Sequence, residues 1–179
     1  MSLLVTAWLW RHERESQQTN LHNSFDFGLR QATTRIQSRL TSYEQILRGV
    51  GGLFAASDRV GADDFSNYVD SLSSGPDFAG LRSLAYAPLK RSAASTSAPL
   101  TFAAPVVGPI VGPIGRDILA EPVRAAALTQ AMDSGAITVT QRLPVGTEAA
   151  PEWGFLMCLP VYRKNLPVDS LERRRANLE

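Results

Sequence analysis

The chain has 179 residues and a mass of 19.4 kDa, which allows one large domain or two small ones. Hydrophobic residues make up 44% of it, enough to build a buried core, so wholesale disorder is excluded. Eighteen lysines and arginines against 17 acidic residues leave a net charge of +1, which argues against nucleic acid as a partner. The single cysteine, Cys158, excludes an internal disulfide and a cysteine-based zinc site.

The first ten residues are interpreted as the remnant of a transmembrane helix or as an added expression sequence. Leu3 to Trp10 is apolar, but a spanning helix needs about 20 such residues. Two tryptophans followed by the charged segment 11–15 are typical of a membrane helix where it meets water, although a helix start packed on protein is the alternative. The arginine-rich segment 172–175 is interpreted as a second cut boundary of a longer membrane protein.

A single long helix is predicted from about residue 10 to about residue 56, within a segment assigned to 11–57. Proline is absent from this segment, and apolar residues recur at steps of three and four. The apolar positions are Leu21, Phe25, Leu29, Ala32, Ile36, Leu40, Tyr43, Leu47, Val50 and Phe54. At about 70 Å, such a helix exceeds a domain with a radius of gyration of about 16 Å, so part of it must extend outward or pair with something. Three glycines at 49, 51 and 52 indicate a close approach of another backbone or a helix break.

A second helix and a mixture of strands and one more helix are expected after residue 57. Residues 62–72 carry acidic residues in their first turn and Phe65, Tyr68 and Val69 on one face. Strands are predicted at 81–87, 100–107, 137–140 and 153–161, a loop at 90–99, a turn-rich connection at 107–114, and a helix from 122 that Gly135 ends. This order predicts an α+β fold with a mainly antiparallel sheet.

Catalytic and metal-binding patterns are not found in the sequence. No nucleophile elbow, P-loop, zinc-protease helix or dinucleotide fingerprint is present. His12 and His22 are not spaced as a helical ligand pair, and Cys158 lies in an apolar strand typical of an inert buried thiol. The sequence therefore predicts no enzyme activity, no cofactor and no metal in this chain.

Six blocks of sequence, in the same order, resemble those of one family of sensor domains. The blocks are residues 43–57 (YEQILRGVGGLFAAS), 65–69 (FSNYV), 76–88, 114–117 (IGRD), 131–135 and 159–162 (LPVY). Together they resemble the CHASE domain, the extracytoplasmic sensor domain of bacterial signalling receptors and of plant cytokinin receptor kinases.

The resemblance implies a fold and a function. The family fold places a long N-terminal helix on tandem PAS-like sheets, so residues 58–161 would form the membrane-distal, ligand-binding part and residues 162–179 would begin an incomplete membrane-proximal part. It implies a periplasmic small-molecule sensor of a transmembrane receptor, dimeric through its N-terminal helix. It further implies membrane attachment through flanking helices that this sequence would lack, and an output by a histidine kinase or a diguanylate cyclase/phosphodiesterase. The alternative is a structural dimerisation spacer with no ligand.

The resemblance also implies a ligand site. The family aspartate that stands 18 residues before the helix-ending glycine falls on Asp117, and the neighbouring strand residue falls on Val139. The pocket wall falls on Met157 and Cys158. Further lining candidates are Phe102, Tyr86 and Leu143. An N-terminal helix cap is the equal alternative for Asp117, and a core position is favoured for Tyr86 and Phe102. The expected ligand is a small purine-like molecule or a carboxylate.

Overall fold

The computed structural model describes residues 2–93, 95–105, 113–144 and 152–178, with side chains described from residue 25 onward. The chain divides into two units, residues 1–41 and residues 42–179. No described helix has a stretch both long and apolar enough to span a membrane.

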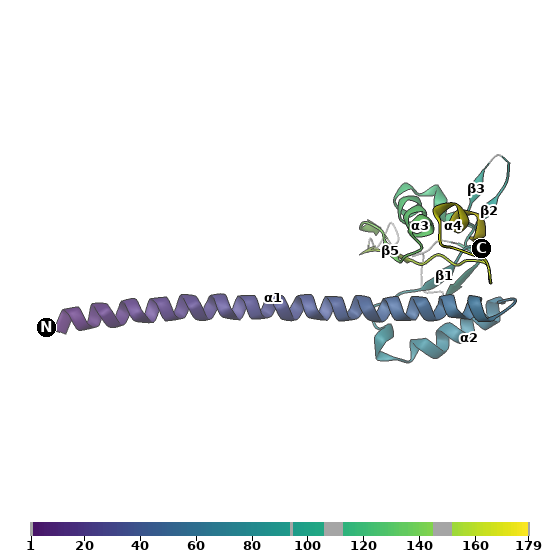
Figure 1. Ribbon diagram of the computed structural model, residues 1–179. Coiled ribbons are helices and arrows are strands. Elements are labelled where there is room, and N and C mark those ends of the chain that lie inside the picture. Colours follow the sequence, from purple (N-terminus) through teal and green to yellow (C-terminus); the bar gives the residue numbers. More distant parts are fainter. Residues whose placement is uncertain (1, 94, 106–112, 145–151, 179) are drawn as a thin grey trace. The chain divides into compact units, whose positions relative to one another are not determined.

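Groups of helices and groups of short strands follow one another along the chain (Figure 1). The helices are α1 (Ser2–Ala56), α2 (Ala62–Ser73), α3 (Pro122–Ser134) and α4 (Leu171–Asn177), with 3-10 helices η1 (Pro76–Phe78) and η2 (Ile118–Ala120). The strands are β1 (Leu84–Tyr86), β2 (Lys90–Arg91), β3 (Thr96–Ser97), β4 (Phe102–Ala104), β5 (Thr138–Val139), β6 (Leu143–Pro144), β7 (Trp153–Gly154) and β8 (Met157–Cys158).

Helix α1 confirms the predicted long helix but begins earlier than expected. It starts at Ser2 rather than near residue 10, because neither proline nor glycine interrupts the chain before Gly28. The glycines near its end neither break the helix nor lie against another backbone, but side chains approach two of them closely. A Cβ on Gly49 would lie 2.9 Å from the Tyr68 hydroxyl, and one on Gly51 would lie 3.1 Å from Leu159 Cδ2. These glycines let α2 and the segment after β8 pack closely on the helix.

The main core of residues 42–179 forms where the last turns of α1 meet α2 and β1. Ile46, Val50 and Phe54 recur every four residues on α1 and are buried against Phe65 and Val69 of α2. Helix α2 lies alongside this part of α1 in Figure 1. The burial of these three residues shows that this face of the helix points into the protein.

Helix α2 matches its prediction within one residue. The Asp64 carboxylate accepts a hydrogen bond from the Gly61 backbone N–H at 3.0 Å, so an acidic side chain closes the first turn. Asp63 and Asp64 also place negative charge where the helix dipole is positive.

The strands pair two by two and antiparallel. The pairs are β1 with β4, β2 with β3, β5 with β8 and β6 with β7. In the first of these, Leu84 lies opposite Ala104 and Tyr86 opposite Phe102. Mixed helices and small antiparallel pairs confirm the α+β class. Among the described residues no sheet exceeds two strands, so the PAS-like sheets remain a prediction.

The predicted loop at 90–99 is wrong in part, because Lys90–Arg91 and Thr96–Ser97 pair as the strands β2 and β3. Ser92 donates its backbone N–H to the Ser95 carbonyl at 2.8 Å, and its hydroxyl accepts from the Ser95 N–H at 3.1 Å. Serine side chains of this kind close turns by bonding to nearby backbone. A serine-rich segment therefore folds back on itself here.

The predicted strand at 153–161 is interrupted, because its two halves pair with different strands. Leu156 donates its N–H to the Thr140 hydroxyl at 2.9 Å, where a regular ladder would use a backbone carbonyl. The Thr140 N–H in turn donates to the Leu156 carbonyl at 2.9 Å. The strands predicted at 81–87, 100–107 and 137–140 are also shorter, at Leu84–Tyr86, Phe102–Ala104 and Thr138–Val139. Residues 106–112, which hold most of the predicted connection 107–114, lie outside the described residues.

Helix α3 begins and ends where its end signals predict. The Glu121 carboxylate accepts hydrogen bonds from the Val123 and Arg124 N–H groups, and Pro122 occupies the first turn. Gly135 ends the helix with a φ of 72°, a left-handed conformation that glycine adopts without strain. This fixes the orientation of the residues that α3 presents to the core.

Candidate functional site

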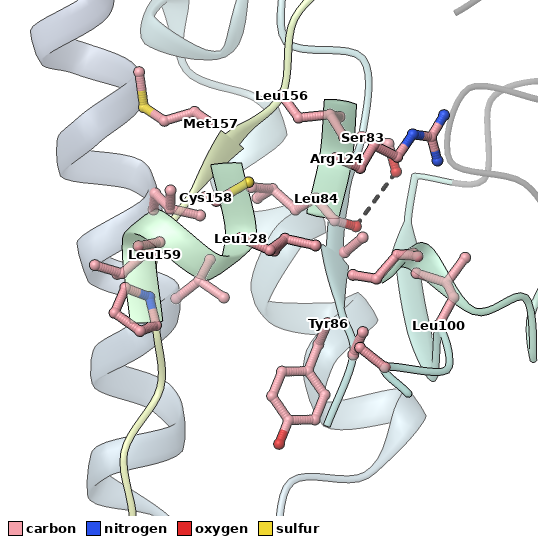
Figure 2. A pocket seen from close by; sticks show the side chains of 18 of the residues that line it. Ser83, Leu84, Tyr86, Leu100, Arg124, Leu128, Leu156, Met157, Cys158 and Leu159 are labelled. Carbon is pink, nitrogen blue, oxygen red and sulfur yellow. Dashed lines mark hydrogen bonds between the residues drawn. The ribbon is translucent and has the colours of Figure 1, made fainter. Parts of the chain in front are cut away.

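A cavity of about 450 Å³ lies within residues 42–179 (Figure 2). Its walls come from the last turns of α1, from β1, from α3 and from the β7–β8 segment. The volume is in the range of ligand pockets, which are mostly apolar with a few polar groups that orient the ligand. The labelled side chains in Figure 2 include the apolar Leu84, Leu100, Leu128, Leu156 and Leu159.

Helix α3 supplies one wall of the cavity at regular helical intervals. Arg124, Leu128, Ala131 and Met132 all line it, with steps of four, three and one residues. This is the spacing of one helix face. Gly51 of α1 also lines the cavity.

Arg124 is the feature of the cavity that the sequence-based prediction missed. Only 6% of the residue is exposed, and its Nε lies 3.7 Å from Glu121 Oε2. Burial, with a smaller contribution from Arg116, lowers the pKa of the Arg124 guanidinium below its usual value. The only local signal is a single arginine in an otherwise apolar run, residues 122–128 (PVRAAAL), which is equally compatible with an exposed arginine.

Three of the predicted site residues are brought together at this cavity. Tyr86, Met157 and Cys158 all line it, from β1 and β8. Tyr86 also stacks on Phe54 with ring centroids 4.1 Å apart, so it is a core residue that reaches the cavity wall. Burial raises the pKa of the Cys158 thiol to about 11, which keeps the thiol protonated at neutral pH.

Asp117 is found as a cap and not among the residues that line the cavity. Its Oδ1 accepts hydrogen bonds from the Leu119 N–H at 3.0 Å and from the Ala98 N–H at 2.8 Å. The first of these caps η2, as the alternative interpretation predicts. Its neighbours Ile118 and Leu119 do line the cavity. A ligand contact by Asp117 remains a prediction.

The remaining predicted site residues are not among those that line the cavity. Phe102 stacks on Phe65 and Tyr86 at 5.6 and 5.8 Å, which is the favoured core position. Leu143 is buried against Leu156, one layer behind the cavity wall. Val139 lies at a second pocket beside Trp153.

The other charged groups of the cavity lining are exposed. Arg82 and Glu152 form an ion pair with about half of each side chain exposed. Such pairs contribute little to stability. Across the described part of the chain, no group of histidine, cysteine and acidic side chains is arranged to hold a metal ion.

Comparison with known families matches residues 58–179 to the CHASE domain. The match covers more than half of the 179 residues, and the chain belongs to the CHASE domain family. CHASE domains are extracytoplasmic sensor domains of signalling receptors and are not catalytic. A search of the curated proteins found no match.

Proposed function

We propose that this chain is the periplasmic ligand-binding domain of a transmembrane receptor, and that its ligand occupies the cavity between α1, β1, α3 and β8. The observation that carries this proposal is a largely apolar cavity of about 450 Å³ inside a domain of a sensor family. The proposal includes the PAS-like architecture that the resemblance implies and an output by a histidine kinase or a diguanylate cyclase/phosphodiesterase.

Helix α3 offers a physical route from the cavity to the C-terminal segment. One face of α3 lines the cavity, and its C-terminal end is hydrogen-bonded to α4. Arg174 Nε donates to the Asp133 carbonyl at 2.7 Å, and the Tyr162 hydroxyl donates to the Met132 carbonyl at 3.1 Å. A ligand that moves α3 therefore biases the position of α4, provided it binds the two positions with different affinity.

The alternative function is a dimerisation spacer without a ligand. One observation favours it: the Asp117 carboxylate oxygen is already engaged in capping. In this case the cavity is a packing defect, and receptor dimers form through residues 21–40 of α1.

A thermal-shift screen with purines, amino acids and carboxylates separates the two functions. A sensor ligand at a hundredfold excess over its Kd raises the melting temperature by about 5–10 °C, because it binds only the folded state. A broad library without a hit favours the spacer.

A variant with a bulky side chain in the cavity tests whether a compound found in the screen binds there. Leu128→Trp places a larger side chain in the cavity and should remove the shift, whereas Leu166→Trp, at an exposed position outside it, should retain the shift. A shift that survives Leu128→Trp contradicts binding in this cavity.

The predicted ligand role of Asp117 has its own test. Asp117→Ala should cost about 1 kcal/mol of stability, because it removes a cap. Loss of the ligand-dependent shift in the folded variant would support a contact with the ligand. If the variant melts at a lower temperature but the ligand still raises that temperature by the same amount, Asp117 acts only as a cap.

A further inference from the structure

The charged side chains in the lining of the cavity are already paired within the protein. Among the described lining residues they are Arg82, Glu152 and Arg124. Arg82 and Glu152 form an ion pair with each other. Arg124 is buried, and its Nε lies 3.7 Å from Glu121 Oε2, which makes a second ion pair. A charged group on a ligand would therefore meet cations and an anion that already have partners in the protein.

Three uncharged polar side chains of the lining offer a ligand little either. The Tyr43 hydroxyl donates a hydrogen bond to the Ala79 carbonyl at 2.8 Å, and the Ser83 hydroxyl donates to the Leu84 carbonyl at 3.3 Å. The third group is the Cys158 thiol, which is a weak hydrogen-bond donor. Burial raises the pKa of this thiol to about 11, so it carries no charge at neutral pH.

Leucine side chains from distant segments cover much of the remaining wall (Figure 2). Leu84 lies in β1 and Leu128 in α3, whereas Leu156 and Leu159 flank β8. Such a wall binds hydrocarbon because it removes apolar surface from water.

We infer that the cavity selects a neutral, largely apolar molecule and rejects carboxylates and ammonium ions of the same shape. This inference rests on the proposed ligand-sensing function. An ion that enters the cavity loses its hydration, and this cost is offset only where a partner of opposite charge is available. Here the charges of the lining are engaged with each other or with Glu121. The carboxylate expected from the sequence is thus set aside in favour of a neutral ligand.

The test compares ligands that differ in charge but hardly in shape. The neutral probes are 1-octanol and 2-naphthalenemethanol. Their anionic counterparts are octanoate and 2-naphthoate, their cationic counterparts are octylammonium and 2-naphthylmethylammonium, and adenine serves as a neutral polar probe. Binding to the 179-residue chain is measured at pH 7 by calorimetry and by thermal shift. We expect at least one alcohol to bind about 10-fold or more tightly than either of its ions and than adenine.

Alkylation of Cys158 locates the bound alcohol without a variant. Because the thiol lines the cavity, a saturating alcohol should slow its reaction with iodoacetamide about 10-fold or more in the folded chain. The urea-unfolded chain with the same alcohol is the control and should react at its ordinary rate. An unchanged rate in the folded chain with alcohol bound would place the ligand elsewhere and overturn the inference.

A variant of Glu121 tests whether the ion pair is what excludes a carboxylate. Glu121→Gln keeps the shape but removes the charge that faces Arg124, so the preference for an alcohol over its carboxylate should fall about 10-fold. Glu172→Gln, the same change at an exposed position of α4 outside the lining, should leave the preference intact. An unchanged preference in folded Glu121→Gln would contradict the role of this ion pair. If that variant does not fold, the alcohol-to-carboxylate ratio of the unmodified chain still decides the ligand class.

The possible results separate this inference from the function on which it rests. Ions or adenine that bind as tightly as the alcohols would overturn the neutral apolar class while leaving a ligand-binding domain. The same conclusion follows if no alcohol binds but the broader screen yields a purine, an amino acid or a carboxylate. No binding by any probe, together with no hit in that screen, would overturn the sensor function and this inference with it.

Discussion

At the scale of single residues, the Cys158 thiol is a reporter of the cavity. It lines the cavity, and burial raises the pKa of the thiol to about 11, an effect that the nearby Arg124 cation partly offsets. Only the thiolate reacts with alkylating agents, so the reactivity of this cysteine depends on both its burial and its charge environment.

Alkylation of Cys158 by iodoacetamide should be slow at neutral pH and should rise about tenfold per pH unit up to about pH 11. The rate is followed by mass spectrometry, with the urea-unfolded chain as the control for an ordinary thiol. Arg124→Gln should slow the reaction further, because a cation that favours the thiolate is removed. A native rate equal to the unfolded rate would contradict the burial of this thiol.

Replacing glycine by alanine is expected to change the stability in opposite directions at two positions. Gly52→Ala should stabilise the protein by about 0.5–1 kcal/mol, because Gly52 is helical and a Cβ there would meet nothing within 4 Å. Gly135→Ala should destabilise it by about 1 kcal/mol or more, because φ is 72° and the Cβ would lie 3.1 Å from Arg174 Cδ. Chemical denaturation measures the free energy of unfolding of the two variants. A change in the same direction in both would contradict the structure.

At the scale of elements, the C-terminal end of α3 holds α4 through charged groups. The Asp133 carboxylate accepts two hydrogen bonds from Arg175, each 2.7 Å long. Arg174 adds a hydrogen bond to the Asp133 carbonyl, so two cations lie at the negative end of the α3 dipole. The attachment of α4 thus depends on Asp133.

Asp133→Asn should release α4 and make the chain easier for trypsin to cut after the arginines at 173–175. Asp169→Asn is the matched control, because it breaks the ion pair with Arg173 inside the same segment without touching α3. The early cleavage products are identified by mass spectrometry. Equal protection in both variants would show that Asp133 does not hold α4.

The same contact predicts a pH dependence. The hydrogen bond from Arg175 lowers the pKa of the Asp133 carboxyl below its ordinary 3.8. Because the pKa of Asp133 is lower in the folded state than in the unfolded state, the contact contributes its full stabilisation above pH 3.8. That stabilisation is lost as the pH falls through the pKa of the folded state. The difference in melting temperature between the unmodified chain and Asp133→Asn should therefore shrink with acidification in that range.

At the scale of the whole molecule, the first unit of the chain shows an exposed apolar stripe on α1. Phe25, Leu29 and Ile36 are 64%, 52% and 61% exposed. They belong to the predicted apolar series along the helix, and a row of this kind on a helix is typical of a helix–helix interface. It supports the proposed homodimer.

Light scattering should give twice the 19.4 kDa mass for the 179-residue chain, which indicates a dimer, and the mass of a monomer for a chain that begins at Ser42. Ile36→Glu should weaken the dimer, because it places a charge in the stripe, whereas Gln31→Glu, a polar exposed position nearby, should leave it intact. Dimerisation through this part of α1 would be contradicted if the 179-residue chain is a monomer. It would also be contradicted if the chain that lacks residues 1–41 is still a dimer.

Local patterns in the sequence predicted α1, α2 and α3 well, but they missed α4 and predicted the strands poorly. The interval of four residues on α1, the acidic first turn of α2 and the Gly135 cap all involve neighbours close in the chain, and the structure has each of them. The break between β7 and β8 depends instead on the Thr140 hydroxyl, which is 16 residues from Leu156. A bond over that separation leaves no periodic signal.

The amino-acid sequence by itself determined the class of fold, the long helix and the family, because these follow from periodicity, end signals and ordered blocks of residues. Only the tertiary structure decided which residues share the cavity. It joined Tyr86, Met157 and Cys158, placed Asp117 in a cap, and brought in Arg124 from the apolar run that starts α3. The physical reason is that the cavity walls come from four segments distant in the chain, and the face that a helix turns inward is set by packing against those segments.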